Sequence, residues 1–444
     1  MPNVTLLLAQ IAVILLVART VGLLFRRIGQ PQVMGEMVAG ILLGPSLLGW
    51  AAPGISAALF PPESLGFLNS LSQIGLLLFM FLVGLDLNPR VLREQKHAAL
   101  VTSHVSIIMP FFMGTVLALY LYPRLSDDSV AFSHFALFVG TAMSITAFPV
   151  LARILTERNL IHSRVGTITI ACAAVDDVTA WCILAGVVLL VRASNASLPL
   201  WLTLSGTAIY VGVMFYGTRR LLRRLEIIHQ ARAKLTQDML GVILLFVLAS
   251  AWVTERLSIH ALFGAFLMGV IMPKDELFVG AIREKLESLT VVLLLPVYFA
   301  FTGLRTSIGL LSGADMWFYC GIIMAVAITG KFGGATLSAR LSGMSWREAG
   351  AIGVLMNTRG LMELVILNIG LDIGVISSSL FTMMVVMALV TTFMTTPLLE
   401  LMHPAQERWQ DLAPAKTPRT VWRLSTINFS EWQKPDGSHR PGSF

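Results

Sequence analysis

Two adjacent acids, Asp176 and Asp177, lie inside an apolar run that extends from about residue 165 to residue 191. The nearest charges on either side are Arg164 and Arg192. Because a helix rises about 1.5 Å per residue, Asp177 lies roughly 20 Å of helix from either arginine. A bilayer hydrocarbon core is about 30 Å thick, so the pair is expected close to its middle. An ionised group there costs roughly 2.5 kcal/mol or more, which favours a functional site over a buried pair that only packs helices.

A lysine lies at similar depth in a later apolar run. Lys331 is nine residues, or about 14 Å of helix, from the basic residue Arg340 at the end of that run. We interpret it as too deep to extend its ammonium to water, so we expect it to need a carboxylate partner. The alternative is a lysine whose chain reaches the membrane surface.

A third run contains hydroxyls beside a proline, in the order Ser144, Thr146 and Pro149. Proline removes a backbone donor and clashes with the preceding turn of a helix, so a break is expected here. Hydroxyl and freed carbonyl oxygens would then lie at mid-depth, and such hard ligands suit an alkali cation. The alternative is an ordinary proline kink whose backbone groups are satisfied by Ser and Thr.

A fourth run carries Asn357, Arg359, Gly360 and Glu363 at its middle but no proline. We predict a second interruption there, with Asn357, Arg359 and Glu363 supporting the site. Elsewhere, Gly40 and Gly44 form a small-residue face, which fits packing inside the chain or a contact between subunits equally well.

The composition places all these residues in a membrane protein. The 444 residues are 56% apolar and 13% charged, against about 25% charged for a soluble domain. The net charge of +7 does not indicate nucleic acid, because the basic residues lie in short loops between apolar runs. We find no cofactor-binding pattern, so no cofactor is expected.

Hydropathy predicts an all-α polytopic protein with about thirteen transmembrane helices. Their approximate limits are 4–24, 33–49, 67–86, 98–122, 133–154, 165–191, 199–218, 237–255, 259–272, 288–307, 316–339, 348–370 and 376–402. Lys and Arg gather in alternate loops, whereas the intervening loops carry only Arg124, Arg192, Arg256 and Arg305. By the positive-inside rule, the N-terminus is outside and the C-terminus is in the cytoplasm. The basic stretch 218–238 is expected to lie on the cytoplasmic leaflet.

Residues 1–402 are predicted to form the transmembrane domain, and residues 403–444 a short cytoplasmic tail that is disordered or loosely bound to the surface. If the seventh span is a linker, spans 1–6 and 8–13 are two halves of six helices. The fifth and twelfth spans, both with polar middles, then correspond and run in opposite directions. This is the pattern of an inverted repeat whose two discontinuous helices cross at a central site.

Three stretches resemble motifs of the monovalent cation:proton antiporter superfamily, in its second branch, and are most similar to plant and fungal cation/H⁺ exchangers and their bacterial relatives. They are 144–153 (SITAFPVLAR), 174–178 (AVDDV) and 355–364 (LMNTRGLMEL). The resemblance extends over all the predicted spans, from about residue 4 to residue 402.

The resemblance implies a homodimer in the bacterial inner membrane, bound by lipid. In it, helices 4–6 and 11–13 form an ion-transporting core that slides like an elevator against a scaffold of helices 1–3 and 8–10. It also implies that Asp177 binds cation or proton, while Asp176 pairs with Lys331. Relatives with the most similar motif often have Asn at the first position of the pair. This chain has Asp176 there, as the bacterial electrogenic type does, which leaves the stoichiometry open. The tail is too short for the nucleotide-binding domain of the glutathione-gated branch.

The sequence-based hypothesis is therefore an antiporter that exchanges Na⁺ or K⁺ for H⁺, and not an enzyme. Asp177 would bind cation and proton in turn, Asp176 and Lys331 would balance charge, and Thr146 and Ser144 would supply accessory oxygens. A passive K⁺ channel without proton coupling is the first alternative. An intramembrane aspartyl protease fits poorly, because its two acids must come from separate segments, and a cation sensor is a further alternative. Na⁺ and K⁺ are not distinguished by the sequence.

Overall fold

The computed structural model describes residues 4–87, 97–127, 129–158, 160, 163–195, 200–232 and 234–402, and this part of the chain is helical with no strand. The predicted tail, residues 403–444, lies outside the described residues. The first helices are α1 (Val4–Arg27), α2 (Gln32–Leu43), α3 (Leu48–Ala51), α4 (Pro53–Leu59), α5 (Pro62–Asp86), α7 (His97–Leu125), α8 (Phe132–Ser144), α9 (Phe148–Glu157) and α10 (Arg164–Asn195).

The remaining elements include three π-helical segments and one 3₁₀ turn. They are α11 (Leu200–Gly212), η1 (Val213–Thr218), α12 (Arg219–Arg232), α13 (Gln237–Arg256), α14 (Ala261–Ile271), α15 (Glu276–Leu289), η2 (Thr290–Leu294), α16 (Leu295–Leu304), η3 (Ile308–Leu310), α17 (Ala314–Ile328), η4 (Thr329–Gly333), α18 (Gly334–Leu341), α19 (Trp346–Met356), α20 (Leu361–Asp372) and α21 (Ser378–Met402).

Ten helices of the described residues are long and apolar enough to cross a membrane. The pair α19 and α20, bent by 42° at a break, makes eleven if it is counted as one span, and α14 is a shorter apolar helix. The membrane class and the all-helical fold are thereby confirmed. Each predicted span overlaps a helix, but the count of thirteen spans stays a prediction.

Polar residues at the loop ends set where several helices begin. Thr236 caps α13 by accepting a hydrogen bond from Met239 N, and Asp275 caps α15 in the same way. Ser345 and Glu348 form a capping box at the start of α19. Such caps satisfy backbone N–H groups that have no partner inside the helix, so they fix the ends of the helices beside the loops.

Glycines bring the backbones of one group of helices into direct contact. A Cβ atom on Gly40 would lie 2.1 Å from the carbonyl oxygen of Phe299, and one on Gly44 would lie 2.2 Å from that of Gly303. Helix α2 therefore packs backbone to backbone on α16, and Gly84 gives α5 the same contact with α14. The small-residue face predicted at Gly40 and Gly44 packs inside the chain.

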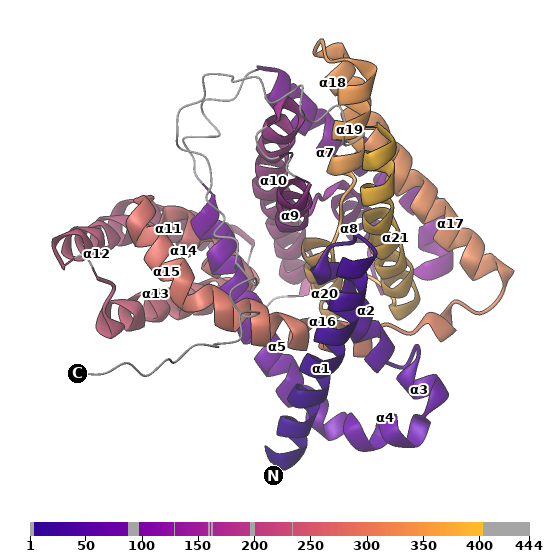
Figure 1. Cartoon of the computed structure of the whole chain (residues 1–444), viewed down its shortest axis with the longest axis horizontal. Coiled ribbons are helices and arrows are strands. Elements are labelled where there is room, and N and C mark those ends of the chain that lie inside the picture. Colours follow the sequence, from indigo (N-terminus) through magenta and orange to yellow (C-terminus); the bar gives the residue numbers. More distant parts are fainter. Residues whose placement is uncertain are drawn as a thin grey trace, which may run out of the picture.

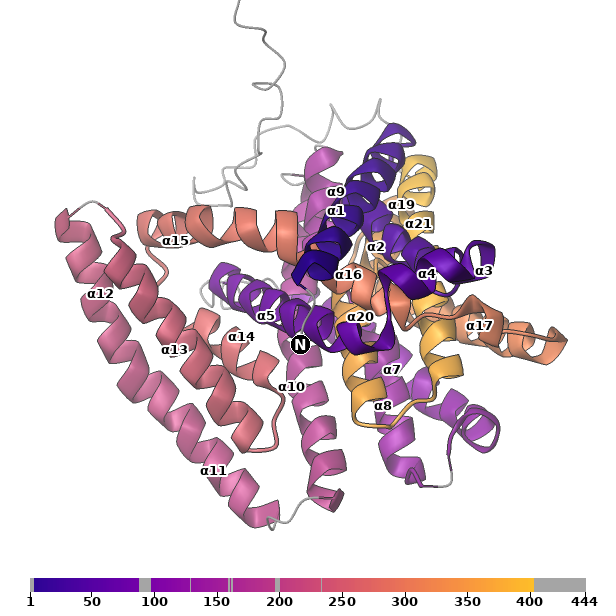
Figure 2. The ribbon, with the colours of Figure 1, turned by 90° about the horizontal axis from the view of Figure 1, so that it is seen from below.

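A second group of helices is joined in the same way. Gly140 brings α8 onto α7, Gly330 brings η4 onto Pro110 of α7, and Gly353 brings α19 onto Phe332 of η4. Figure 1 shows α11–α15 at one side of the molecule and α17 at the other, with α1, α2, α5, α16 and α20 between them. The view from below in Figure 2 places α7 and α8 on the side of α17 and α21.

One contact between the two groups is made by polar side chains of α16 and α20. Arg305 forms an ion pair of 2.6 Å with Asp372 and donates to Oδ1 of Asn368 at 3.1 Å. The amide nitrogen of Asn368 lies 2.9 Å from Oγ1 of Thr302 and 3.2 Å from the hydroxyl of Tyr298. No glycine of the described residues brings these two helices together, so side chains alone make this contact.

The segment before α16 differs from the sequence-based expectation. Residues 273–287 were predicted as a loop before a span at 288–307, but helix α15 begins at Glu276 and continues through η2 into α16. The buried amine of Lys274 donates to the carbonyl oxygens of Gly84, Leu85 and Gly269, at the ends of α5 and α14. Hydropathy does not detect α15, because its exposed face is polar.

Candidate ion site

Two interrupted helices meet at the centre of the second group. Helix α8 ends at Ser144 and α9 begins at Phe148, with Pro149 in its first turn, where a missing N–H costs nothing. Helix α19 ends at Met356 and α20 begins at Leu361. The breaks touch, since Ala147 N donates to the carbonyl oxygen of Thr358 at 2.9 Å. Both predicted interruptions are present, and they lie against each other.

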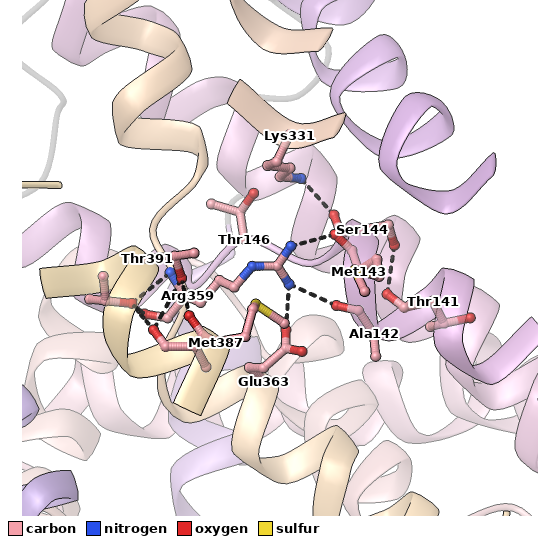
Figure 3. Close-up of polar contacts among 12 residues, drawn as sticks. Thr141, Ala142, Met143, Ser144, Thr146, Lys331, Arg359, Glu363, Met387 and Thr391 are labelled. Atoms are coloured by element: carbon pink, nitrogen blue, oxygen red, sulfur yellow. Dashed lines mark hydrogen bonds and ion pairs between the residues drawn. The ribbon is translucent and has the colours of Figure 1, made fainter. Parts of the chain in front are cut away.

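Two cations cap the end of α8, as Figure 3 shows. Nζ of Lys331 donates to the carbonyl oxygen of Ser144 at 2.6 Å. The guanidinium of Arg359 donates to the carbonyls of Ala142 at 2.9 Å and Met143 at 2.6 Å. The last carbonyls of a helix have no partner within it and carry partial negative charge, so both cations stabilise this buried helix end.

A π-helical segment presents Lys331 to this point. Lys331 lies in η4, between Gly330 and Gly333, and is fully buried. Local π-helical turns shift the direction of side chains and are frequent at functional sites. The close approach of Gly330 to Pro110 brings η4 against α7, which carries Lys331 inward to the crossing.

A buried ion pair supports the second break. Arg359 and Glu363 lie 2.9 Å apart with no exposed side-chain surface. Glu363 is in the first turn of α20, where the positive end of a helix favours an anion. Asn357 is in the break itself, and its Oδ1 atom is buried without a hydrogen-bond partner among the described residues.

The carboxylate of Asp176 is held by four donors. Ser103 of α7 donates to Oδ1 at 2.7 Å, while Ser106, Thr146 and Lys331 lie 3.0, 3.0 and 2.8 Å from Oδ2. Asp176 is fully buried. The 2.8 Å contact with Lys331 makes the two residues a buried ion pair whose oxygens are all hydrogen-bonded.

Asp177 is in the opposite situation. It is 1% exposed, and neither of its carboxylate oxygens has a hydrogen-bond partner among the described residues. The N–H of Phe148, at the start of α9, lies close enough to interact with it, and a helix N-terminus attracts an anion. An unpaired buried charge is costly, so this carboxyl group requires a proton or a cation.

The structure brings together every residue proposed from the sequence, but it arranges the hydroxyls differently. The Thr146 hydroxyl lies 3.0 Å from Asp176 and 3.1 Å from the carbonyl of Met356, and the Ser144 hydroxyl donates to the carbonyl of Thr141. Neither is bonded to Asp177, so their role as accessory oxygens stays a prediction. Ser103 and Ser106 were missed, because hydroxyls in an apolar helix give no signal until the facing helix is known.

A cavity of about 200 Å³ lies between α17, α19 and α21. Its lining is largely apolar and includes Asn357 and Thr395 but not Asp177. Asp177 does not border this cavity and, at 1% exposure, is enclosed by protein.

The fold and the site define a class of membrane transporter in which two interrupted helices cross beside buried charged residues. The family described as "Sodium/hydrogen exchanger, transmembrane" matches residues 12–401. The chain belongs to this family, as the resemblance of its motifs predicted.

Several proteins named as antiporters are similar to this chain. It is 44% identical over 403 residues to the Na⁺/H⁺ antiporter NhaS4 of Synechocystis sp., which covers 90% of this chain and 98% of the relative. It is 41% identical to cation/H⁺ antiporter 17 of Arabidopsis thaliana and 35% identical to K⁺/H⁺ antiporter 1 of Saccharomyces cerevisiae. These matches cover 88% and 91% of this chain but 48% and 47% of the relatives, so the chain spans about half their length.

A solved structure shares the fold. The sodium proton antiporter MjNhaP1 of Methanocaldococcus jannaschii aligns with a TM-score of 0.62 over 91% of this chain and 97% of the other. The sequences are 14% identical, so the likeness concerns the fold alone.

Proposed function

We propose that this chain exchanges a monovalent cation, Na⁺ or K⁺, for H⁺, and that Asp177 binds the two ions in turn. The observation that carries the proposal is the contrast between neighbouring acids. Asp176 has four donors around it, whereas neither carboxylate oxygen of Asp177 has a hydrogen-bond partner among the described residues. Family membership and the relatives named as Na⁺/H⁺ and K⁺/H⁺ antiporters support the same reaction and do not favour a passive channel.

Competition for one carboxylate couples the two ions. Burial makes an uncompensated charge on Asp177 costly, so the acid is neutralised either by a proton or by a cation. The charge of Asp176 is already balanced by Lys331. Asp177 therefore binds one partner at a time, and alternating exposure to the two sides is sufficient for exchange.

The exposure requires a movement, because Asp177 is enclosed. We assign spans 1–3 and 8–10 to a scaffold, spans 4–6 and 11–13 to a mobile core and span 7 to a linker, in an inverted repeat of thirteen helices. The glycine contacts support this division, since they join α2 to α16 and α5 to α14 on one side and α7, α8, η4 and α19 on the other. The core would then move past the scaffold in the manner of an elevator.

The remaining parts of the proposal follow from the sequence. The distribution of Lys and Arg supports an external N-terminus and a cytoplasmic C-terminus in a bacterial inner membrane. A homodimer embedded in lipid would hold the scaffold still while the core moves. Asn357, Arg359 and Glu363 would support the crossing, and Ser144 and Thr146 would lend oxygens to the cation when it is bound.

The test is exchange by purified protein in proteoliposomes loaded with a pH-sensitive dye. Adding Na⁺ or K⁺ with the membrane potential clamped should move protons in the wild type and not in Asp177→Asn. Asp315→Asn is the matched control, because Asp315 is an exposed acid at the start of α17 and its loss should leave exchange intact. Proton-coupled flux in folded Asp177→Asn would contradict the assignment, and cation flux without proton movement would indicate a channel.

A further inference from the structure

Two hydroxyls of α7 lie against the acid pair from a helix that the sequence did not associate with the site. Ser103 and Ser106 are one turn apart and fully buried, and both hydroxyls reach the carboxylate of Asp176. The neighbouring Thr102 is equally buried, but its hydroxyl has no partner among the described residues. Contact with Asp176 is therefore a property of these two serines and not of every hydroxyl on α7.

The two serines are not equivalent. Ser103 donates to Oδ1 of Asp176 at 2.7 Å, and no other described residue bonds this oxygen. The Ser106 hydroxyl lies 3.0 Å from Oδ2 of Asp176 and 2.8 Å from the carbonyl oxygen of Ser103, so its one hydrogen is shared between them. Ser103 consequently fixes the side of the carboxylate that Lys331 and Thr146 leave open.

The carboxylate of Asp176 is thus held from two directions. Helix α7 binds Oδ1 through Ser103 and shares Oδ2 through Ser106, while η4 and the break after α8 bind Oδ2 through Lys331 and Thr146. A side chain fixed in this way cannot turn toward Asp177, which is one residue further along α10 and points about 100° away. Without the α7 hydroxyls, the freed oxygen of Asp176 would seek a new partner, because an unpaired buried acceptor is costly.

We propose that Ser103 and Ser106 are positioning residues that keep Asp176 out of the ion site, so that Asp177 is the single carboxylate ligand of the transported cation. This inference rests on the proposed role of Asp177. The serines act through Asp176 and do not touch the cation. A site with one carboxylate exerts a weaker electrostatic field on the cation than a site with two. The strength of this field influences which alkali cation is preferred, and a stronger field favours a smaller ion.

The test compares Ser103→Ala/Ser106→Ala with Ser103→Thr and the control Thr102→Ala in proteoliposomes. For each protein, the maximal exchange rate and the apparent KM are measured with Li⁺, Na⁺ and K⁺. In the double variant, the freed oxygen of Asp176 should join Asp177 as a second ligand. The apparent KM should fall several-fold, with a shift of preference toward the smaller Li⁺. Ser103→Thr retains a hydroxyl and should behave as the wild type, as should Thr102→Ala.

A merely structural role gives a different result. Loss of packing would raise the apparent KM or lower the maximal rate for all three cations together, and this outcome overturns the inference. Unchanged KM and cation preference in the folded double variant overturn it as well. If that variant does not fold, Ser103→Cys, which retains only a weak donor, must shift the preference in the same direction. None of these outcomes affects the test of Asp177→Asn, so the two proposals fail separately.

Discussion

The buried pair of Arg359 and Glu363 allows a sharp test of how the crossing is stabilised. In Arg359→Met, Glu363 keeps its carboxylate but loses the cation 2.9 Å away. The carbonyls of Ala142 and Met143 also lose their donor. Methionine fills similar volume, so the packing of the break should be largely retained while the electrostatic support is removed.

The expected loss is large. Breaking a buried ion pair by removing one partner costs about 3–5 kcal/mol, because the remaining charge is buried without a partner. We expect a loss of about 4 kcal/mol in the free energy of unfolding. For about 400 ordered residues at about 2.1 cal/mol/K each, this corresponds to a fall in melting temperature of about 5 °C.

The assay is thermal melting of the detergent-solubilised protein. The fraction that remains folded after heating is measured by size-exclusion chromatography. Arg153→Met is the matched control, because Arg153 and Glu157 have the same i,i+4 spacing at 2.9 Å but are 41% and 38% exposed. Exposed pairs contribute little, so its melting temperature should stay within about 1 °C. Arg359→Met/Glu363→Leu should melt above Arg359→Met, because no lone charge remains. Equal melting of Arg359→Met and the wild type, or a double variant below the single one, would refute the reasoning.

Two further predictions concern packing and pH. Gly303→Ala should prevent folding or strongly lower the melting temperature, because its Cβ would lie 2.0 Å from the backbone of Gly40, whereas Gly321→Ala has open space and should melt normally. Burial, together with nearby Arg219, lowers the pKa of Lys274 to about 7. Between about pH 7 and 10 the unfolded chain therefore binds more protons, so stability should rise with pH in this range. In Lys274→Met, the melting temperature should no longer rise between about pH 7 and 10. If it rises as in the wild type, the lowered pKa of Lys274 is contradicted.

The positions of the helices and the place of the site could be predicted because both depend on local signals. Asp176, Asp177 and Lys331 are conspicuous as charges in apolar runs, and Pro149 marks the first break through its missing N–H. The second break, without a proline, was inferred from the polar residues 357–363 and from its position relative to the first. These signals survive in a single sequence, since they do not depend on neighbouring helices.

Contacts between distant helices could not be predicted. That Arg359 caps α8, that Ser103 binds Asp176, and that the partner of Gly40 is α16 all depend on the packing of helices far apart in the chain. A serine in an apolar run can bond to its own helix or to a neighbour, and its sequence is the same in both cases. Helix α15 was missed for another reason, because an amphipathic surface helix does not reach the hydropathy of a span.

The two kinds of helix contact differ in how they respond to shear. Where glycine closes the gap, as between α2 and α16, the main chains touch and a shift of one residue would force side chains into backbone. The contact of α16 with α20 is made instead by the side chains of Arg305, Asn368 and their partners. Such bonds can be released singly and re-formed with other groups. Any slippage between α16 and α20 should therefore proceed by breaking these side-chain bonds, while the glycine contacts stay closed.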